Sequence, residues 1–409
     1  MSQDTKPAKR DLQTVTAARA VMLGRLAPLG PETVMLDEAL GRVLAEDVVA
    51  RRDQPPYAAS AMDGYAVRAA DTPGLLHVTG ESAAGRGFEG VVETGDAIRI
   101  STGAPLPDGA DAIVIQEDAV RERDQVTVPA AKAGRHIRPR GGDFTADTLL
   151  LPVARKLDGV ALALAAASGA ASLRVMRQPR VAILCSGDEL VSPGKAPGPF
   201  QIYDSATHGV AALVRTWGGI PQRLVLARDD VQGIAAAAQQ GLRDSDLLLV
   251  LGGASVGDHD HARPALLQLG LELLVEKVAV RPGKPTWFGV TPHGPVLGLP
   301  GNPASALVCA WLFLRPLMET MLGRDPQDCV RFRRARLSHP LLANGPREHY
   351  LRGRTHVDGE GRLTVQSFED QDSSLLSVFA AANALIRLMP GAEALETGAL
   401  VDVLPLDVA

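Results

Sequence analysis

The feature that most constrains the fold is an alternation of short apolar runs and helical patterns between residues 179 and 324. Four apolar runs have the length of buried strands, at 181–185, 223–227, 246–251 and 296–299. Helical spacing separates them, at 205–217, 231–242 and 262–269, and a long helix is expected from Pro303. Because strands joined through helices run parallel, this segment predicts a parallel, three-layer α/β domain.

The flanking sequence predicts three further domains. Gly- and Pro-rich residues 53–143 contain alternating runs at 97–101 and 112–116 and predict an inserted β domain. Helical spacing at 14–26, 36–44 and 157–168 predicts a helical N-terminal domain from residues 1–52 plus 144–178. Residues 325–409 show alternating runs without a long helix and predict a C-terminal β domain, which leaves 179–324 as the α/β domain.

Composition excludes several classes of function. The formal net charge of −5 over 409 residues argues against nucleic acid as a partner. The three cysteines, Cys185, Cys309 and Cys329, form no CxxC pair, which disfavours structural zinc and disulfides and fits a reducing compartment. The longest apolar run, 160–167, is too short to span a bilayer, and the polar start lacks a secretory segment. We therefore expect a soluble, cytoplasmic protein without a membrane partner.

Two small-residue turns follow predicted strands of the α/β domain. CSGDEL (185–190) exposes backbone N–H groups, and its acids Asp188 and Glu189 are able to hold a metal or a hydroxyl. LGGASVGDHD (251–260) allows a ligand close to the backbone, with His259 between two aspartates. Solvated acids on ordinary turns, and a solvated His259, explain both segments as well, so neither motif alone fixes a site.

Two later segments suggest an anion site. In a strand, Lys277 and Arg281 would share one face, about 13 Å apart, and the turn after them presents Lys284. Solvated lysines on an edge strand are the alternative. In LPGNPASA (299–306), Asn302 is expected to cap a helix and Pro303 to take its first position, which leaves N–H groups for a phosphate.

Composition does not distinguish other polar residues. Asp63 and Asp143 lie on glycine-bearing turns, where acids usually stabilise the turn itself. The arginines of the C-terminal region are explained as solvated strand faces. They are Arg331, Arg333, Arg334, Arg336, Arg347, Arg352 and Arg354.

In combination, these segments resemble the molybdopterin molybdenumtransferase family (MoeA, and the E domain of gephyrin-type proteins). The matching motifs run from about Thr14 to the C-terminus and are SAMDGYA (60–66), GDEL (187–190) with IYDS (202–205), RDD (228–230), GGASVGDHD (252–260), PGKP (282–285) and LPGNPASA (299–306). The resemblance implies an elongated four-domain protomer that dimerises. Its active site would lie between the α/β domain of one subunit and the inserted β domain of the other.

The resemblance also implies the reaction and its residues. Molybdate is inserted into adenylated molybdopterin with release of AMP and the help of Mg²⁺, and transient contact with the molybdopterin adenylyltransferase is expected. The implied catalytic residues are Asp63, Asp143, Glu189, Asp229, Asp260, Lys277 and Lys284, with Glu189, Asp229 and Asp260 as metal ligands. The implied substrate-binding residues are Ser186, Gly187, Arg228, Gly252, Gly253, Ser255, Gly257, Arg281, Pro282, Gly283, Pro300, Gly301, Asn302 and Pro303. Fixed cations and N–H donors suit a dianionic oxometalate, and a divalent cation would separate it from the acids.

This chain departs from the family pattern at four positions. Ser186 replaces a threonine and Arg281 a lysine, which keeps the hydroxyl and the charge, whereas Ala206 and Gly142 replace an asparagine and a glutamate. Three alternatives remain: a tungstate-handling paralogue, a non-catalytic pterin-binding scaffold, and a related adenylyltransferase module. The domains before and after the α/β domain argue against the last.

Overall fold

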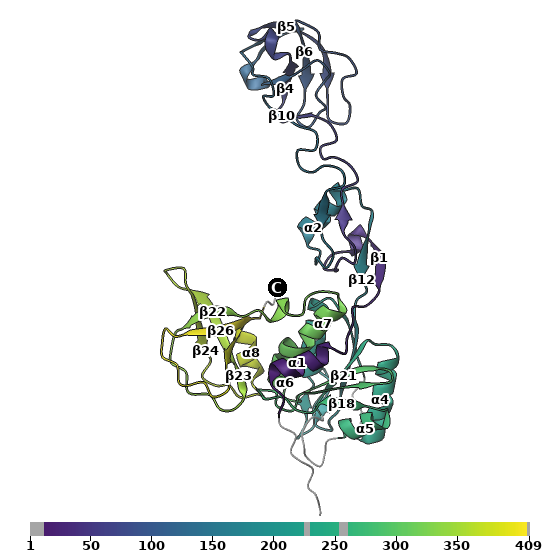
Figure 1. The fold of residues 1–409 in the computed structure, drawn as a ribbon, viewed down its shortest axis with the longest axis vertical. Helices are drawn as coiled ribbons and strands as arrows, with labels where there is room; N and C mark the ends of the chain where they lie inside the picture. Colours follow the sequence, from purple (N-terminus) through teal and green to yellow (C-terminus); the bar gives the residue numbers. More distant parts are fainter. Residues whose placement is uncertain (1–11, 225–229, 253–260, 407–409) are drawn as a thin grey trace, which may run out of the picture. The chain divides into compact units, whose positions relative to one another are not determined.

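The computed structural model describes residues 12–224, 230–252 and 261–406. The chain divides into two compact units, each described here by itself. The inserted unit comprises Thr33–Leu40 and Leu44–Arg174, and the main unit comprises Met1–Glu32, Gly41–Val43 and Val175–Ala409. The main unit holds an α/β domain and a C-terminal β domain (Figure 1).

The α/β domain of the main unit is built on one six-stranded sheet. Its strands, in spatial order, are β16 (Ile220–Arg223), β13 (Arg180–Cys185), β17 (Leu247–Leu251), β21 (Gly294–Leu299), β20 (Trp287–Thr291) and β18 (Glu272–Val275). The first four run parallel, as expected. The prediction of a wholly parallel sheet was wrong, because β20 runs antiparallel to β21 across a turn between Thr291 and Gly294 that is too short for a crossover. β18 is antiparallel to β20.

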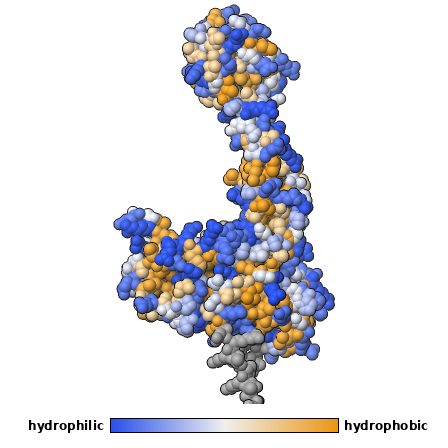
Figure 2. Space-filling model, viewed as in Figure 1, coloured by the Kyte–Doolittle hydropathy of each residue, from blue (hydrophilic) through white to orange (hydrophobic). Residues whose placement is uncertain are grey.

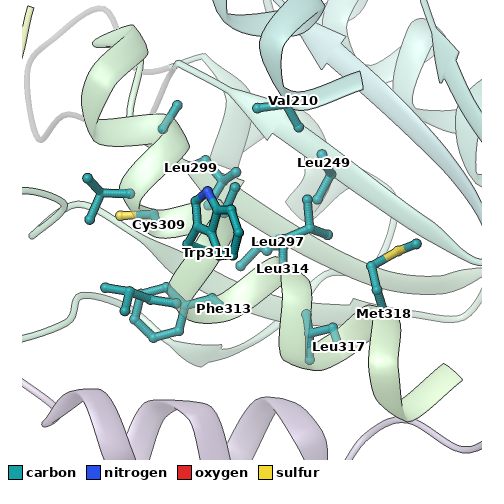
Figure 3. Packing of buried hydrophobic residues seen from close by; sticks show 14 of the residues in the cluster. Val210, Leu249, Leu297, Leu299, Cys309, Trp311, Phe313, Leu314, Leu317 and Met318 are labelled. Carbon is teal, nitrogen blue, oxygen red and sulfur yellow. The ribbon is translucent and has the colours of Figure 1, made fainter. Parts of the chain in front are cut away.

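Helices cover both faces of this sheet, which confirms the three-layer arrangement. One face is covered by α4 (Val231–Arg243) and α5 (Ala262–Gln268). The other carries α3 (Ala206–Thr216) and a helical run of α6 (Pro303–Cys309), a π-helical segment (Ala310–Leu314) and α7 (Arg315–Met321). In Figure 3, Trp311 and Leu314 of this run lie against Leu297 and Leu299 of β21.

The run Pro303–Met321 is long and apolar enough to cross a membrane by length and composition. Most of this run is buried inside the protein. Trp311, Phe313 and Leu317 are fully or almost fully buried in the largest hydrophobic cluster. We therefore interpret it as a core helix of the main unit.

The first helix, α1 (Val15–Leu23), begins where the sequence predicts. Thr14 caps it, because its Oγ1 accepts a hydrogen bond from the Ala17 amide at 3.1 Å. Val15, Ala18 and Met22 place its apolar stripe in the core of the main unit, beside α7 and β18. The expectation that this helix belongs to a separate N-terminal helical domain was therefore wrong.

The remainder of that predicted helical domain is not clearly helical either. Residues 36–44 form no α-helix: β1 (Pro31–Met35) leads into a short 3₁₀ turn (Leu36–Glu38), and Gly41 adopts a φ of +75° that ends any helical path. β1 pairs with β12 (Ser172–Met176), and β2 (Val48–Val49) pairs with β11 (Leu149–Leu151). Only α2 (Gly159–Ala167) matches the helical pattern, capped by Asp158.

The inserted β domain is confirmed. Its six-stranded sheet has the order β7-β4-β6-β5-β9-β8, and β6 and β7 match the two predicted runs. The strands are β4 (Gly64–Val67), β5 (Gly74–Ser82), β6 (Asp96–Ile100), β7 (Ala112–Ile115), β8 (Val120–Glu122) and β9 (Gln125–Val128), and β3 (Ala59–Ser60) pairs with β10 (Ile137–Arg138). Further 3₁₀ turns lie at Ala69–Asp71 and Gln116–Asp118.

The C-terminal β domain closes on itself as a barrel. Its strands are β22 (Arg333–Leu337), β23 (Glu348–Val357), β24 (Leu363–Ser367), β25 (Ala384–Leu388) and β26 (Leu400–Pro405), after a 3₁₀ turn at Asp328–Val330. The order β23-β24-β22-β26-β25 ends with β25 pairing back onto β23. The helix α8 (Leu376–Ala381) has six residues, so the prediction of a β domain without a long helix is confirmed.

A short strand of the α/β domain joins the two domains of the main unit. β19 (Val280–Arg281) pairs with the start of β23, with Val280 opposite Glu348 and Arg281 opposite His349. The segment predicted to carry the anion-binding cations is therefore anchored to the C-terminal domain.

Candidate functional site

The site begins where three neighbouring parallel strands end. Cys185, Leu251 and Leu299 are aligned across β13, β17 and β21. Gly252, just after Leu251, has a φ of +86°, and a Cβ placed on Gly301 would come within 3.3 Å of the Gly252 Cα. The strand-end turns thus pack together through positions that lack side chains. The carboxyl edge of a parallel sheet is where α/β domains bind ligands.

A cavity of about 930 Å³ opens at this edge between the α/β domain and the C-terminal β domain. The structure gathers around it many of the residues predicted from the sequence. These are Ser186, Gly187, Glu189, Gly252, Arg281, Pro282, Gly283, Lys284, Pro300, Gly301, Asn302 and Pro303. These predicted residues, from four separate segments of the sequence, therefore line one cavity.

Other predicted residues are not gathered there. Lys277 is not among the lining residues, because β18 ends at Val275 and β19 begins only at Val280. The expectation that Lys277 and Arg281 share the face of one strand was therefore wrong. The predicted residues Arg228, Asp229, Gly253, Ser255, Gly257 and Asp260 lie outside the described residues.

The turn that carries the cations packs against Cys309, the last residue of α6. Gly283 has a φ of +114°, and a Cβ there would lie 2.2 Å from the Cys309 Sγ. Thr286 donates a hydrogen bond from its Oγ1 to that sulfur at 3.2 Å. Burial raises the pKa of the Cys309 thiol to about 12, so it remains a neutral packing group. The turn holds Lys284 exposed at the cavity.

The C-terminal domain supplies a wall that sequence reasoning missed. Arg347 lines the cavity and donates from Nη1 to the Val280 carbonyl at 3.3 Å. Arg352, only 1% exposed, donates from Nε to Gln371 Oε1 and from Nη1 to the Asp372 carbonyl. The expectation that these arginines are solvated was wrong for both. The signal in the sequence for a partly buried strand was the Tyr350-Leu351 pair, which lies between these two arginines.

The acid Glu189 follows β13 in the sequence and lines the cavity. A Cβ on Gly187 would meet its Oε2 at 2.6 Å, so the carboxylate lies over the turn, and Gly187 has a φ of +150°. The Ile202 amide donates to the Glu189 carbonyl at 2.7 Å. This contact belongs to the small sheet of β14 (Leu190–Val191) and β15 (Ile202–Tyr203). Asp188 is not among the lining residues.

A second acid, Asp204, was not predicted as a site residue. It lines the cavity but is 6% exposed, and it accepts hydrogen bonds from the Thr207 amide at 3.1 Å and from the Thr207 hydroxyl. Its carboxylate therefore satisfies the first turn of α3. In the sequence, an acid three residues before a threonine at a helix start was the signal for this capping interaction.

Asn302 has a different role from the predicted one. Its side chain makes no capping hydrogen bond to α6; its Nδ2 instead donates to Ser373 Oγ at 2.8 Å. Pro303 takes the first helical position, as predicted. Asn302, which was expected to cap α6, therefore links the α/β domain to the C-terminal domain beside the cavity.

The two remaining acids belong to the inserted unit. Asp63 accepts a hydrogen bond from the Thr102 amide at 2.7 Å, which holds the pKa of its carboxyl below the usual range. Asp143 is exposed, and its amide donates to the Gln54 carbonyl. Asp63 thus stabilises a turn, and a catalytic role for either residue stays a prediction.

No group of three metal-binding side chains occurs within residues 12–224, 230–252 and 261–406. Two of the three predicted metal ligands lie outside those ranges. Glu189 is exposed and has no hydrogen bond or ion pair through its side chain within the described residues. Its carboxylate oxygens are of the type that Mg²⁺ prefers.

Taken together, the fold and the cavity define a multidomain α/β protein whose strand-end site is suited to an anionic small molecule. Three family models match the chain: the MoeA N-terminal region (domain I and II) at residues 13–169, a probable molybdopterin binding domain at 182–320, and the MoeA C-terminal region (domain IV) at 334–406. The chain belongs to the MoeA family of molybdopterin molybdenumtransferases, the transferases of molybdenum cofactor biosynthesis.

Similar proteins span nearly the whole chain. A molybdopterin molybdenumtransferase of Nostoc sp. is 35% identical over 92% of this chain and 89% of its own length. The Haemophilus influenzae protein of the same name is 33% identical over 96% and 98%. The crystal structure of a molybdopterin biosynthesis MoeA protein from Pyrococcus horikoshii is 30% identical, with a TM-score of 0.83 over 98% of this chain and all of that one.

Proposed function

We propose that this protein inserts molybdate into adenylated molybdopterin and releases AMP, completing the molybdenum cofactor. The family membership and the names of its relatives support the transfer of molybdenum to molybdopterin. The observation that carries the proposal is the cavity at the strand ends, which combines a cationic turn, a cationic wall and glycine turns.

The chemistry of the cavity matches such substrates. Arg281, Lys284 and Arg347 offer positive charge to a dianionic oxometalate or a phosphate, and charge-assisted hydrogen bonds of this kind are the stronger ones. Gly187 and Gly252 keep the backbone accessible to a large ligand. A volume of about 930 Å³ lies at the upper end of the range for small-molecule sites.

The proposal includes a magnesium ion near Glu189. Glu189 would hold it together with Asp229 and Asp260, and the ion would offset repulsion between these acids and the anionic substrates. The exposed carboxylate of Glu189 at the cavity supports this assignment. Glu189 itself would orient the cation, while Arg281 and Lys284 bind the anion.

We further propose a cytoplasmic homodimer in which Asp63 and Asp143 of one subunit complete the cavity of the other. The inserted unit exposes large apolar side chains, which soluble proteins commonly cover. They include Met35, Leu40, Leu149, Val153 and Val160, which is 79% exposed. Apolar surface is visible on this unit in Figure 2. Transient contact with the adenylyltransferase that makes the substrate follows from the same proposal.

The direct test supplies the purified protein with adenylated molybdopterin, Mg²⁺ and molybdate. We expect stoichiometric AMP release and cofactor that activates a molybdenum-free acceptor enzyme. Tight pterin binding without AMP release would instead favour a non-catalytic scaffold. Parallel reactions with tungstate measure the preference for the metal.

The shared site is tested by mixing two inactive variants, Asp63→Ala and Lys284→Ala. In a two-fold dimer with shared sites, a mixed dimer collects both changes in one site and leaves the other intact. Equal mixing then restores about a quarter of the parental activity, because about half of the dimers are mixed. No recovery, with subunit exchange confirmed by mass, would place both residues in the same subunit's site.

A further inference from the structure

One buried titratable group of the cavity has no role in the account so far. His349 lies on β23, lines the cavity and is only 8% exposed. Its ring makes no hydrogen bond or ion pair within the part of the chain that the structure describes. Neither ring nitrogen is a fully buried polar atom without a hydrogen-bond partner. The imidazole is therefore available to a ligand in the cavity.

Arginines surround this imidazole. Arg281 is its register partner on β19, Arg347 precedes it by two residues, and Arg352 lies on the same strand. Burial, followed by the charges of these three arginines, lowers the pKa of His349 to about 4. Without an anion in the cavity, His349 is thus neutral at physiological pH.

The acids nearby do not offset these arginines at His349. Successive residues of a strand point to opposite faces, and Glu348 accepts a hydrogen bond from Tyr350 Oη at 2.7 Å and lies near Arg387. On β25 the register partner is Leu388, which carries no charge. Of the acids that line the cavity, Asp204 is bonded to Thr207.

The other charged groups that line the cavity are Lys284, Asp372 and Glu189. Asp372 accepts from the amide and hydroxyl of Ser374. Glu189 lies over the turn at Gly187. Lys284 adds a further positive charge, so an incoming anion would be the group that compensates the cations.

We propose that His349 contacts the oxyanion bound in the cavity and takes up one proton from solvent as the anion binds. The bond formed is N–H on the unprotonated ring nitrogen, the proton comes from the buffer, and the anion keeps its charge. A dianion beside the ring supplies the opposite charge that favours imidazolium. The inference rests on the proposed function only in taking this cavity as the anion site.

The sign of the effect follows from linkage. Proton uptake occurs at pH values above the pKa of the ligand-free His349 and below that of the ligand-bound form. Over that interval the affinity for the dianion falls as pH rises, by at most about tenfold per pH unit for one proton. A structural histidine would leave anion affinity independent of this titration.

The experiment uses isothermal titration calorimetry of the full chain with inorganic molybdate, and with sulfate, which stays a dianion throughout. Titrations between about pH 5 and pH 8, in buffers with different ionisation enthalpies, count the protons taken up. The variants are His349→Asn and His349→Phe, which remove the titrating group in two ways. His356→Asn is the matched control, because His356 is exposed on the same strand and is not among the cavity-lining residues.

We expect up to one proton taken up per anion by the parent and by His356→Asn, for both anions. Both His349 variants should take up none and should bind with nearly constant affinity across the pH range. Anion binding by the parent without proton uptake, or uptake that persists in the His349 variants, would overturn the inference. Absence of anion binding by the parent would overturn it too, while AMP release would still test the proposed function separately.

Discussion

The two walls of the cavity hold their ligand-facing groups in different ways. On the α/β side, turns after β13, β17 and β21 approach each other through glycines such as Gly252 and Gly301, and the acid Glu189 lies over one of them. On the side of the C-terminal domain, Arg347 just before β23 and His349 on it line the cavity, and Arg352, which is 1% exposed, is hydrogen-bonded to Gln371. One wall presents mainly backbone and a carboxylate, and the other, called the cationic wall, presents polar side chains with Arg347 as its cation.

This difference suggests a division of labour. A substrate anion gains charge-assisted contacts from the cationic wall and the turn that β19 anchors to it. The glycine turns and Glu189 suit the position of a metal and of the reacting centre. Changes on the cationic side should therefore act mainly on binding, and changes at Glu189 mainly on turnover.

The largest effect is expected from Gly283→Ala, which disrupts the turn between the two walls. The new Cβ would lie 2.2 Å from Cys309 Sγ at a φ of +114°. Strain and overpacking together should lower the free energy of unfolding of the main unit by about 2–4 kcal/mol and abolish measurable AMP release. Denaturant unfolding followed by tryptophan fluorescence measures the first effect, since Trp217, Trp287 and Trp311 all lie in the α/β domain.

A double-mutant cycle separates the two causes. In a Cys309→Ala background the clash with sulfur is removed and only the backbone strain remains, so Gly283→Ala should be less destabilising there. Equal destabilisation in both backgrounds would show that Cys309 does not set the position of the turn.

A smaller effect is expected from Lys284→Ala, which removes one exposed cation and leaves the turn intact. Affinity for molybdate or adenylated molybdopterin should fall roughly ten- to a hundredfold, with little change in stability. Arg354→Ala is the matched control, because Arg354 is an exposed cation on β23 that is not among the cavity-lining residues. Unchanged affinity in Lys284→Ala would remove the turn from the anion site.

The titration of His349 should also appear in stability. Its pKa is lowered to about 4 in the folded state, below the ordinary value of about 6.5. The unfolded chain therefore binds more protons between these values, and stability falls as pH drops through that window. Between pH 7 and pH 5 the loss is roughly 2 kcal/mol. His349→Asn should lack this part of the loss in parallel unfolding curves; an identical pH dependence would contradict the assignment.

The smallest effect is expected from Asn302→Ala. It removes the 2.8 Å hydrogen bond to Ser373, which lies near the surface, so the stability change should stay near 1 kcal/mol. KM for molybdate should rise a few-fold, because the link between the two walls is lost. Ser373→Ala should reproduce this change, and the double variant should add nothing further.

The α/β domain was largely predictable from the sequence because its buried strands and helices are local patterns. Glycine turns and PGKP also identified one side of the cavity. The apolar run 296–299 predicts a strand but not the strand that precedes it. The antiparallel β20 follows from the short turn at Thr291–Gly294, which the pattern did not reveal. The N-terminal helical domain failed because α1 packs into the main unit and Gly41 breaks the next pattern.

The cationic wall was not predictable because it depends on pairing between distant segments. Arg347 and His349 reach the cavity only through the register of β19 with β23, more than 60 residues apart along the chain. Arginines on a predicted strand resemble solvated residues, and the partners that bury Arg352, Gln371 and Asp372, are distant in sequence. Only the tertiary contact distinguishes Arg352, which is 1% exposed, from Arg354, which is exposed.

The division of labour between the two walls is tested most directly by steady-state AMP release from two variants across a range of molybdate concentrations. Glu189→Gln keeps the shape of the side chain but removes its charge, and we expect kcat to fall about tenfold or more with KM within about threefold of the parent. Arg347→Ala should give the reverse, a KM for molybdate raised about tenfold with kcat nearly unchanged. The same pattern in both variants, or the two patterns exchanged, would contradict the account.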